Sequence, residues 1–134
     1  MVGNTEVGIE ARLKGVACPV ILSSACVPEL RTCADAGGGL RIGACVSLTA
    51  VGELCDTVAA GQPACGAAAA IRDMLRWFAS VQIRNVACVG GNLATASPIS
   101  DLNPLLAACG ATLTIASAAR GERQLPVADF FKGC

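Results

Sequence analysis

Apolar residues recur at helical spacing in three segments of this chain. After Ser47, which can cap a helix, one stripe of a predicted helix is formed by Leu48, Val51, Leu54 and Val58. A second helix is predicted over residues 64–79, where Ile71, Leu75 and Phe78 share one face. A third, shorter helix is predicted to begin at Ser100 or Asp101, either of which can cap it, and to end before Gly110.

Short apolar runs and alternating positions predict strands between these helices. A buried strand is predicted at Val20–Leu22, and the alternation at Leu40–Gly43 predicts another. Residues 112–117 are predicted to form a strand that pairs with residues 123–127 through a turn at residues 120–122.

Two glycine-containing segments are expected to be connections. Residues 34–39 are expected to be a flexible link, and residues 81–100 are expected to be mostly loop. Because strands and helices are mixed without strict βαβ alternation, the predicted fold class is α+β and not a doubly wound sheet. A length of 134 residues is consistent with one domain.

Composition excludes several classes of protein. Ten basic and ten acidic residues give a net charge of zero, so there is no basic stripe of the kind that binds nucleic acid. The longest apolar stretch, residues 64–71, is too short and too rich in alanine to cross a membrane. Residues 1–6 show no secretory signal.

The nine cysteines do not form a recognisable metal site. No two are separated by two residues, and the chain has no histidine, so zinc and iron–sulfur ligation are not expected. Their number is odd, which disfavours a disulfide framework. We interpret most of them as small buried hydrophobic residues in a reducing compartment.

Two glycine-centred segments, Gly3–Gly8 and Val89–Thr95, suggest a site for a dinucleotide. Glycine lets the backbone approach a diphosphate closely and allows turns that direct successive N–H groups at one anion. Neither segment is a P-loop or a Rossmann fingerprint. Each alone is more readily a structural turn than a ligand site, but the pair suggests one long ligand held from two sides.

Five motifs in order give the chain a specific resemblance. They are Gly3–Gly8, Leu75–Ala79 (Leu-Arg-Trp-Phe-Ala), Gln82–Ala87, Gly90–Asn92 and Ala96–Pro104. With these motifs the chain resembles the FAD-binding domain of the molybdenum hydroxylases, and within them the xanthine dehydrogenases. The related aldehyde oxidases typically have histidine after the second Gly-Gly and lack Arg-Trp-Phe. Asn92 and Trp77 therefore favour the xanthine enzymes.

The resemblance implies a fold of the molybdopterin dehydrogenase and vanillyl-alcohol-oxidase-like type, with a mixed sheet and packed helices. It implies a partial domain over residues 1–134, with the strand before the first loop incomplete and the next subdomain absent. In such enzymes electrons pass from a molybdenum centre through iron–sulfur clusters to FAD and then to NAD⁺ or oxygen. The clusters and the molybdenum cofactor would lie elsewhere, in a cytoplasmic or peroxisomal homodimer that binds neither nucleic acid nor membrane.

The resemblance also implies which residues contact FAD. The diphosphate and ribityl chain would be wrapped from the first loop by Val2, Gly3, Asn4, Thr5, Glu6, Val7 and Gly8. From the opposite side they would be held by Gly90, Gly91 and Asn92. No catalytic residue and no metal ligand is expected, because a flavin carries the redox chemistry itself.

The remaining candidates have a structural alternative beside the functional one. Phe78 would pack against the adenine end of FAD, or it is a core residue. Asp101 would accept from ribose hydroxyls, or it is a helix cap. Thr95 and Ser97 are weaker candidates for polar contacts near the diphosphate. Cys88 stands where the family usually has Ser or Thr, and its thiol is expected to make a weaker contact.

Two further expectations concern Arg76–Trp77 and the chain as a whole. In the family these two residues match a cation–aromatic cluster near the loop that governs NAD⁺ access, and a solvated Arg beside a surface Trp is the alternative. The alternative for the whole chain is a catalytically silent fragment with at most a protein-interaction role.

Overall fold

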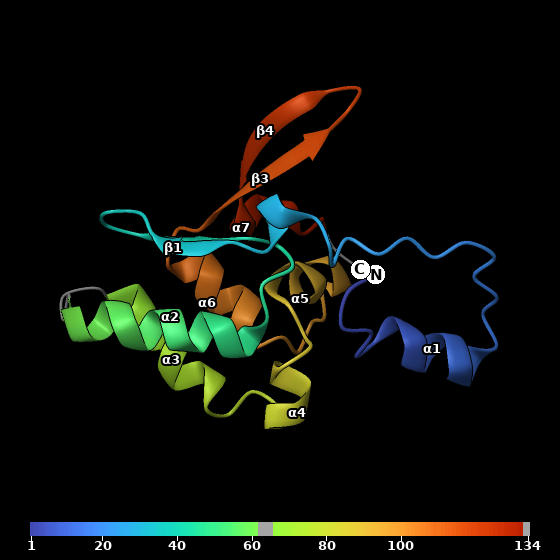
Figure 1. Cartoon of the computed structure of the whole chain (residues 1–134), viewed down its shortest axis with the longest axis horizontal. Helices are drawn as coiled ribbons and strands as arrows, with labels where there is room; N and C mark the ends of the chain where they lie inside the picture. Colours follow the sequence, from blue (N-terminus) through green and yellow to red (C-terminus); the bar gives the residue numbers. More distant parts are fainter. Residues whose placement is uncertain (62–65, 133–134) are drawn as a thin grey trace.

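The computed structural model describes residues 1–61 and 66–132. Figure 1 shows a central group of helices, two hairpins above it and an N-terminal arm to one side. In chain order the elements are α1 Val7–Lys14, the 3₁₀ helix η1 Pro28–Leu30, β1 Cys33–Asp35, β2 Leu40–Ile42, α2 Leu48–Gly61, α3 Gly66–Leu75, α4 Val81–Arg84, α5 Val89–Thr95, α6 Leu102–Ala108, β3 Thr112–Ser117, β4 Gly121–Pro126 and α7 Val127–Phe130.

Helix α2 supplies much of the hydrophobic core. Its buried residues, Leu48, Val51, Cys55 and Val58, follow helical spacing and pack with Ala68, Ile71 and Leu75 of α3. The Ser47 hydroxyl accepts a hydrogen bond from the Ala50 N–H at 3.2 Å, so the predicted cap is confirmed. Leu54, also predicted for this stripe, is half-buried against the same core.

The other two predicted helices are present with different limits. Helix α3 ends at Leu75, four residues before the predicted end, and the predicted start at residue 64 lies outside the described residues. Helix α6 is confirmed, and its first turn is capped by Ser100, whose hydroxyl accepts from the Asn103 N–H at 3.2 Å. Asp101 makes no side-chain capping bond.

The strands form two separate antiparallel hairpins, β1–β2 and β3–β4. The α+β class is confirmed, but the described residues do not join these strands into the mixed sheet that we expected. Strand β3 has the predicted bounds and pairs with β4 as predicted, but β4 begins at Gly121 within the predicted turn and ends at Pro126, because Val127 opens α7. Strand β2 ends one residue before its predicted end. Residues 34–39 are not simply a link, because β1 extends to Asp35 and only the following residues turn, with the Ala36 N–H donating to Gly39 O.

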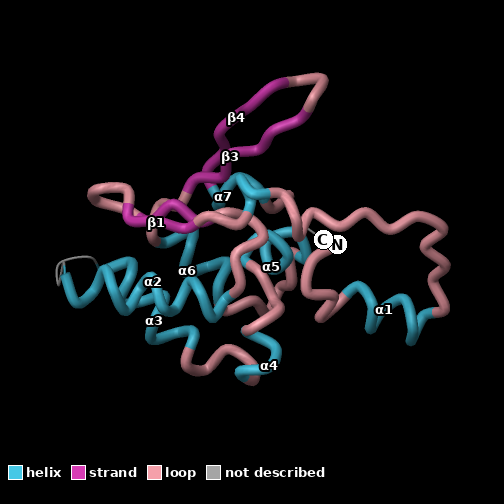
Figure 2. Tube along the Cα trace, viewed as in Figure 1, coloured by secondary structure: helices cyan, strands magenta, loops and turns pink. Residues whose placement is uncertain are grey.

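The prediction of a buried strand at Val20–Leu22 is wrong. Figure 2 shows this segment as part of an irregular arm, and Val20 is 75% exposed. No described strand pairs with it, and helix α1 beside it contributes no buried residue. A short apolar run predicts burial only where a partner element covers it.

The prediction that residues 81–100 are mostly loop is also wrong. Helix α4 is capped by Ser80, whose hydroxyl accepts from the Ile83 N–H, and α5 is capped by Cys88. The second glycine segment, Val89–Thr95, is therefore helix α5, with Gly90 and Gly91 in its first turn. The end of the first motif is helical too, because Val7 and Gly8 open α1.

Most of the described cysteines are not fully buried, contrary to our interpretation. Of the described cysteines, Cys55 and Cys88 are buried, Cys33 and Cys45 are half-buried, and the exposed ones are Cys18, Cys26 and Cys109. Within residues 1–61 and 66–132 no cluster of three or more metal-ligating side chains occurs. No described helix is long and apolar enough to cross a membrane.

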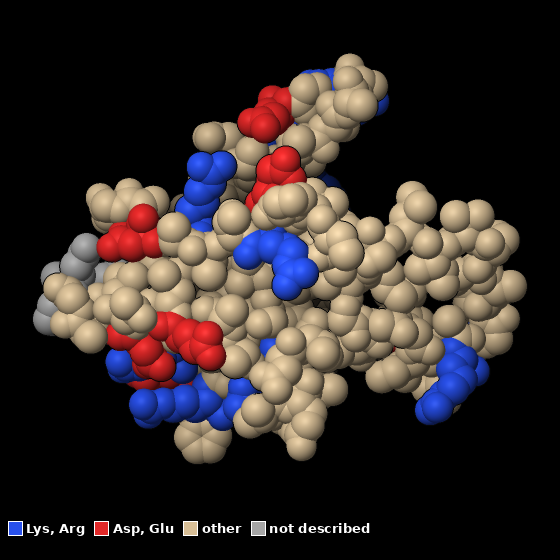
Figure 3. Space-filling model, in the orientation of Figure 1, with Lys and Arg blue, Asp and Glu red and all other residues tan. Residues whose placement is uncertain are grey.

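Charged side chains of both signs are mixed on the surface. Figure 3 shows acidic and basic groups side by side over α2 and α3, where Arg72 lies 3.2 Å from Asp73 and 3.9 Å from Asp56. The face in view has no continuous basic surface, in agreement with the zero net charge.

Candidate functional site

The two glycine motifs, far apart in sequence, line one cleft of about 600 Å³. This volume is in the range of small-molecule sites in proteins. The cleft lies between the N-terminal segment and the chain that runs from α3 to α5. The predicted site residues that line it are Val2, Asn4, Thr5, Glu6, Val7, Phe78, Cys88, Gly91, Asn92 and Thr95.

The N-terminal wall depends on close backbone packing. Gly3 and Asn4 both have positive φ, at 66° and 56°, and the Asn4 N–H donates to Val2 O at 2.7 Å. A Cβ at Gly3 would collide with the Val86 carbonyl, and one at Gly8 would collide with the Asn4 side chain. Neither glycine lines the cleft, but both allow the wall to take its shape.

The start of α1 presents backbone donors at this wall. The first N–H of the helix to be bonded is that of Ile9, which donates to Glu6 O at 2.9 Å. In the described structure the N–H groups of Glu6, Val7 and Gly8 have no acceptor. Unbonded N–H groups at the positive end of a helix suit an anionic or hydroxylated ligand.

The two adjacent glycines of α5 have different surroundings. Gly90 donates its N–H to Ala44 O at 2.9 Å, and a Cβ there would meet the Ala44 Cβ at 2.7 Å. Gly91 is exposed at the cleft, and a Cβ there would meet only Cys88 Sγ, at 3.2 Å. Gly90 therefore serves packing, whereas Gly91 leaves open space for a ligand.

Cys88 is a buried residue at the base of the cleft. Its sulfur accepts from the Gly91 N–H at 3.4 Å and so caps α5. Burial raises the pKa of the Cys88 thiol, and this outweighs the contact with Gly91, which lowers it. The thiol is therefore protonated at neutral pH and is not an activated nucleophile.

A hydrogen bond from Ser100 fixes the orientation of the Asn92 side-chain amide. The Ser100 hydroxyl donates to Asn92 Oδ1 at 3.0 Å. With its oxygen occupied, the amide has its NH₂ group available to donate into the cleft. Behind Ser100 lies Asn103, whose side chain is 5% exposed and has no hydrogen-bond partner among the described residues.

Some predicted residues lie away from the cleft. Asp101 lines a separate hollow of about 440 Å³ with Met74, Trp77 and Leu105. The Ser97 hydroxyl accepts from the Ile99 N–H at 3.4 Å and lies outside the lining. Trp77 is 89% exposed, and in the part of the chain that is described it makes no cation–π contact with Arg76.

Sequence reasoning missed several residues that line or support the cleft. The lining includes Met1, Glu10, Ile83, Ala87 and Ala94. Glu10 lies one turn after Glu6 on α1 and pairs with Lys14 at 2.7 Å. A helical spacing of four could have indicated Glu10, but only if α1 had been predicted.

Comparison with known proteins assigns the family. The family model described as the FAD binding domain in molybdopterin dehydrogenase matches residues 1–134. The chain is 47% identical over 135 residues to xanthine dehydrogenase 2 of Arabidopsis thaliana and 46% identical over 136 residues to the xanthine dehydrogenase/oxidase of Gallus gallus. Each match covers 99% of this chain but only 10% of the relative.

A solved structure agrees on the fold. The cyanide-inactivated Cu,Mo-CO dehydrogenase superposes with a TM-score of 0.79 at 22% identity, covering 95% of this chain and 42% of that one. At this identity the likeness concerns the fold alone. Because the family model matches residues 1–134, the whole length of this chain, the chain belongs to the family of FAD-binding domains of molybdopterin dehydrogenases.

Proposed function

We propose that this chain is the FAD-binding segment of a xanthine dehydrogenase-like oxidoreductase and that the cleft holds the cofactor. The observation that carries the proposal is the meeting of the two glycine motifs at one cleft. Family membership and the identity to xanthine dehydrogenases support it.

The donor groups around the cleft fit a dinucleotide. The unbonded N–H groups at the start of α1 and the bare backbone at Gly91 suit a diphosphate. No described residue lining the cleft is Lys or Arg, so backbone donors would carry this contact. The carboxylates of Glu6 and Glu10 suit ribityl or ribose hydroxyls, because they only accept hydrogen bonds.

The side chains on the α5 side would orient the ligand. Asn92 would donate its NH₂ group to a ligand oxygen, and Phe78 would pack against the adenine end. Thr95 would add a hydroxyl contact. Asp101 and Ser97 remain candidates only for a ligand that extends beyond the cleft, and we assign Gly3, Gly8 and Gly90 to shaping its walls.

When bound, FAD would supply the hydride and electron chemistry, and the chain itself would bind, orient and shield the cofactor. We extend the proposal to a larger protein with iron–sulfur clusters and a molybdenum centre on other domains. Its electron acceptor would be NAD⁺ or oxygen, its role purine catabolism, and its form a homodimer in the cytoplasm or peroxisome. The chain spans about a tenth of the length of the relatives that it matches.

A second candidate is a silent fragment with a protein-interaction role. The observation that favours it is the set of strongly exposed apolar side chains, among them Val20, Leu22 and Trp77. An aldehyde oxidase segment is a further alternative, but Asn92 and Trp77 favour the xanthine enzymes.

The test uses a chimera in which this chain replaces the matching segment of the Arabidopsis thaliana xanthine dehydrogenase 2. We expect the purified chimera to retain stoichiometric flavin through gel filtration, as measured by its visible absorbance. A folded chimera that keeps its other cofactors but lacks flavin would contradict the proposal and favour the silent fragment.

A further inference from the structure

The link between α3 and α4 carries Phe78 to the cleft in a strained conformation. Ala79, which follows Phe78, has a φ of 46°, a left-handed value that non-glycine residues seldom adopt. Such a conformation persists only where neighbouring contacts hold it. The half-buried Phe78 ring lines the cleft with Cys88 and Gly91 and packs against the core.

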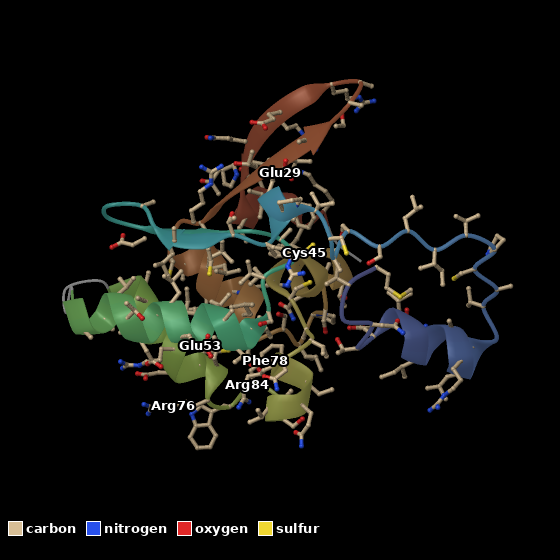
Figure 4. The ribbon with its side chains drawn as sticks, in the orientation of Figure 1. Glu29, Cys45, Glu53, Arg76, Phe78 and Arg84 are labelled. Carbon is tan, nitrogen blue, oxygen red and sulfur yellow. The ribbon has the colours of Figure 1, made fainter. Side chains whose placement is uncertain are left out.

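Arg84 supplies the contacts that hold this link. Its Nη1 donates to Phe78 O at 2.6 Å and to Ala79 O at 2.8 Å. Both bonds are short and charge-assisted, and bonds of this kind are among the stronger ones in proteins. Figure 4 shows Phe78 and Arg84 close together between α3 and α4, with Arg76 farther out on the surface.

The position of Arg84 ties the link to the next helix. Arg84 is the last residue of α4, and its N–H donates to Ser80 O at 3.0 Å. Its guanidinium therefore joins the end of α4 to the two peptide groups that precede it. Ala87 and Cys88, three and four residues further along the chain, line the cleft.

We propose that Arg84 is a positioning residue for the cofactor: it clamps the carbonyl groups of Phe78 and Ala79 and so holds the Phe78 ring in the cleft wall. This inference rests on the proposed FAD site. Arg84 itself does not line the cleft, so it acts through Phe78. Without the clamp, the left-handed turn at Ala79 would relax and the ring would leave its place.

The alternative is that Arg84 acts only by its positive charge near an anionic ligand. Arg76 gives a matched control, because it lies on the same segment, is exposed, and makes no ion pair with any described residue. Removal of either charge should have a similar effect if only the long-range charge matters.

The experiment titrates FAD into the flavin-free chimera. Arg84→Gln should weaken FAD binding roughly tenfold, which is the scale expected when one aromatic ring no longer holds its position against the ligand. Arg76→Gln should bind like the parent. Arg84→Lys, which keeps the charge and several N–H donors, should recover most of the affinity. In a Phe78→Leu background, Arg84→Gln should change the affinity by less than about twofold, because coupled residues are not additive.

Other results would overturn the inference. If Arg84→Gln and Arg76→Gln weaken FAD binding equally, Arg84 acts only through its charge. If Arg84→Gln weakens FAD binding as much in the Phe78→Leu background as in the parent, Arg84 does not act through Phe78. A parent chimera that binds no FAD would instead contradict the proposed function.

A second variant covers the case in which Arg84→Gln does not fold. Glycine adopts positive φ freely, so Ala79→Gly should make the turn less dependent on the clamp. The double variant Ala79→Gly/Arg84→Gln should therefore fold and bind FAD more tightly than Arg84→Gln. If the double variant also fails to fold, Arg84 is required for the fold as a whole and the clamp proposal is wrong.

Discussion

The Ser100 hydroxyl donates to the side-chain oxygen of Asn92 at 3.0 Å and accepts from the Asn103 N–H at 3.2 Å. One hydroxyl therefore both caps α6 and orients an amide at the cleft. The capping motif and the glycine motif are connected through this single side chain.

Ser100→Ala should weaken FAD binding in the chimera because Asn92 loses the partner that directs its NH₂ group into the cleft. The lost cap should also destabilise the protein by about 1 kcal/mol. Binding is measured by flavin fluorescence and stability by thermal unfolding.

An Asn92→Ala background separates the two effects of Ser100→Ala. There the stability loss should remain while the effect on affinity disappears. Thr57→Ala, which removes a hydroxyl bonded to Glu53 O on α2, is the matched control. Equal affinity losses with and without Asn92 would refute the orienting role.

The two glycines of α5 should respond differently to substitution. Gly91→Val should abolish flavin binding while the protein stays folded, because a Cβ at this position meets only Cys88 Sγ and the branched side chain would occupy ligand space. Gly90→Ala should lower the unfolding temperature, since its Cβ would overlap Ala44. Flavin content and circular dichroism check both, and full flavin retention by Gly91→Val would mean that the motif is only a turn.

Cys88→Ser should leave FAD affinity unchanged or increase it by at most ~1 kcal/mol, the net worth of one hydrogen bond. The hydroxyl is a better acceptor for the Gly91 N–H and a better donor to the ligand than the thiol. Isothermal titration measures the difference. A large loss of affinity would show that the thiol has a separate role.

The raised pKa of Cys88 predicts low reactivity and an alkaline loss of stability. Iodoacetamide at neutral pH should modify Cys109, which is exposed, well before Cys88, as followed by peptide mass spectrometry. The folded state favours the neutral Cys88 thiol. The contribution of this thiol to stability is therefore fully present below its pKa in the unfolded chain, and it is lost as the pH rises through its pKa in the folded protein. Wild type should therefore lose more stability than Cys88→Ser above about pH 9.

The 134-residue chain on its own should bind FAD weakly or not at all. One wall of the cleft is carried by α1, which has no buried residue, and the adjoining arm exposes Leu22 and Val20. Little free energy therefore holds that wall in place, and exposed apolar groups favour aggregation. A soluble chain that binds FAD with submicromolar affinity would contradict this.

Local signals in the sequence were sufficient for α2, α6 and the β3–β4 hairpin. Ser47 and Gly110 mark helix ends, and Thr112–Ser117 is rich in strand-forming residues and is followed by a turn signal at residues 120–122. At residues 88–95, however, the glycines suggested a loop, and the cap that makes α5 a helix is a cysteine, which is not a usual capping residue. The prediction of a buried strand at Val20–Leu22 is wrong because burial depends on a partner element that covers the strand.

The residues of the candidate site also include some that the sequence predicted and some that it could not. The motif resemblance led to Gly91, Asn92 and Phe78, and the structure brings all three to one cleft. The Ser100 cap was predicted, but the contact of Ser100 with Asn92 and those of Arg84 with Phe78 and Ala79 could not be, because these partners are brought together only by the folded chain. The contrast between Gly90 and Gly91 likewise depends on where Ala44 lies.

Amide hydrogen exchange of the flavin-free chimera, with and without FAD, tests whether the two glycine motifs form one FAD site. We expect FAD to slow exchange in residues 2–10 and in residues 88–95 together, and to leave exchange in the β3–β4 hairpin unchanged. Protection of only one of the two segments, or of neither while FAD is bound, would contradict it.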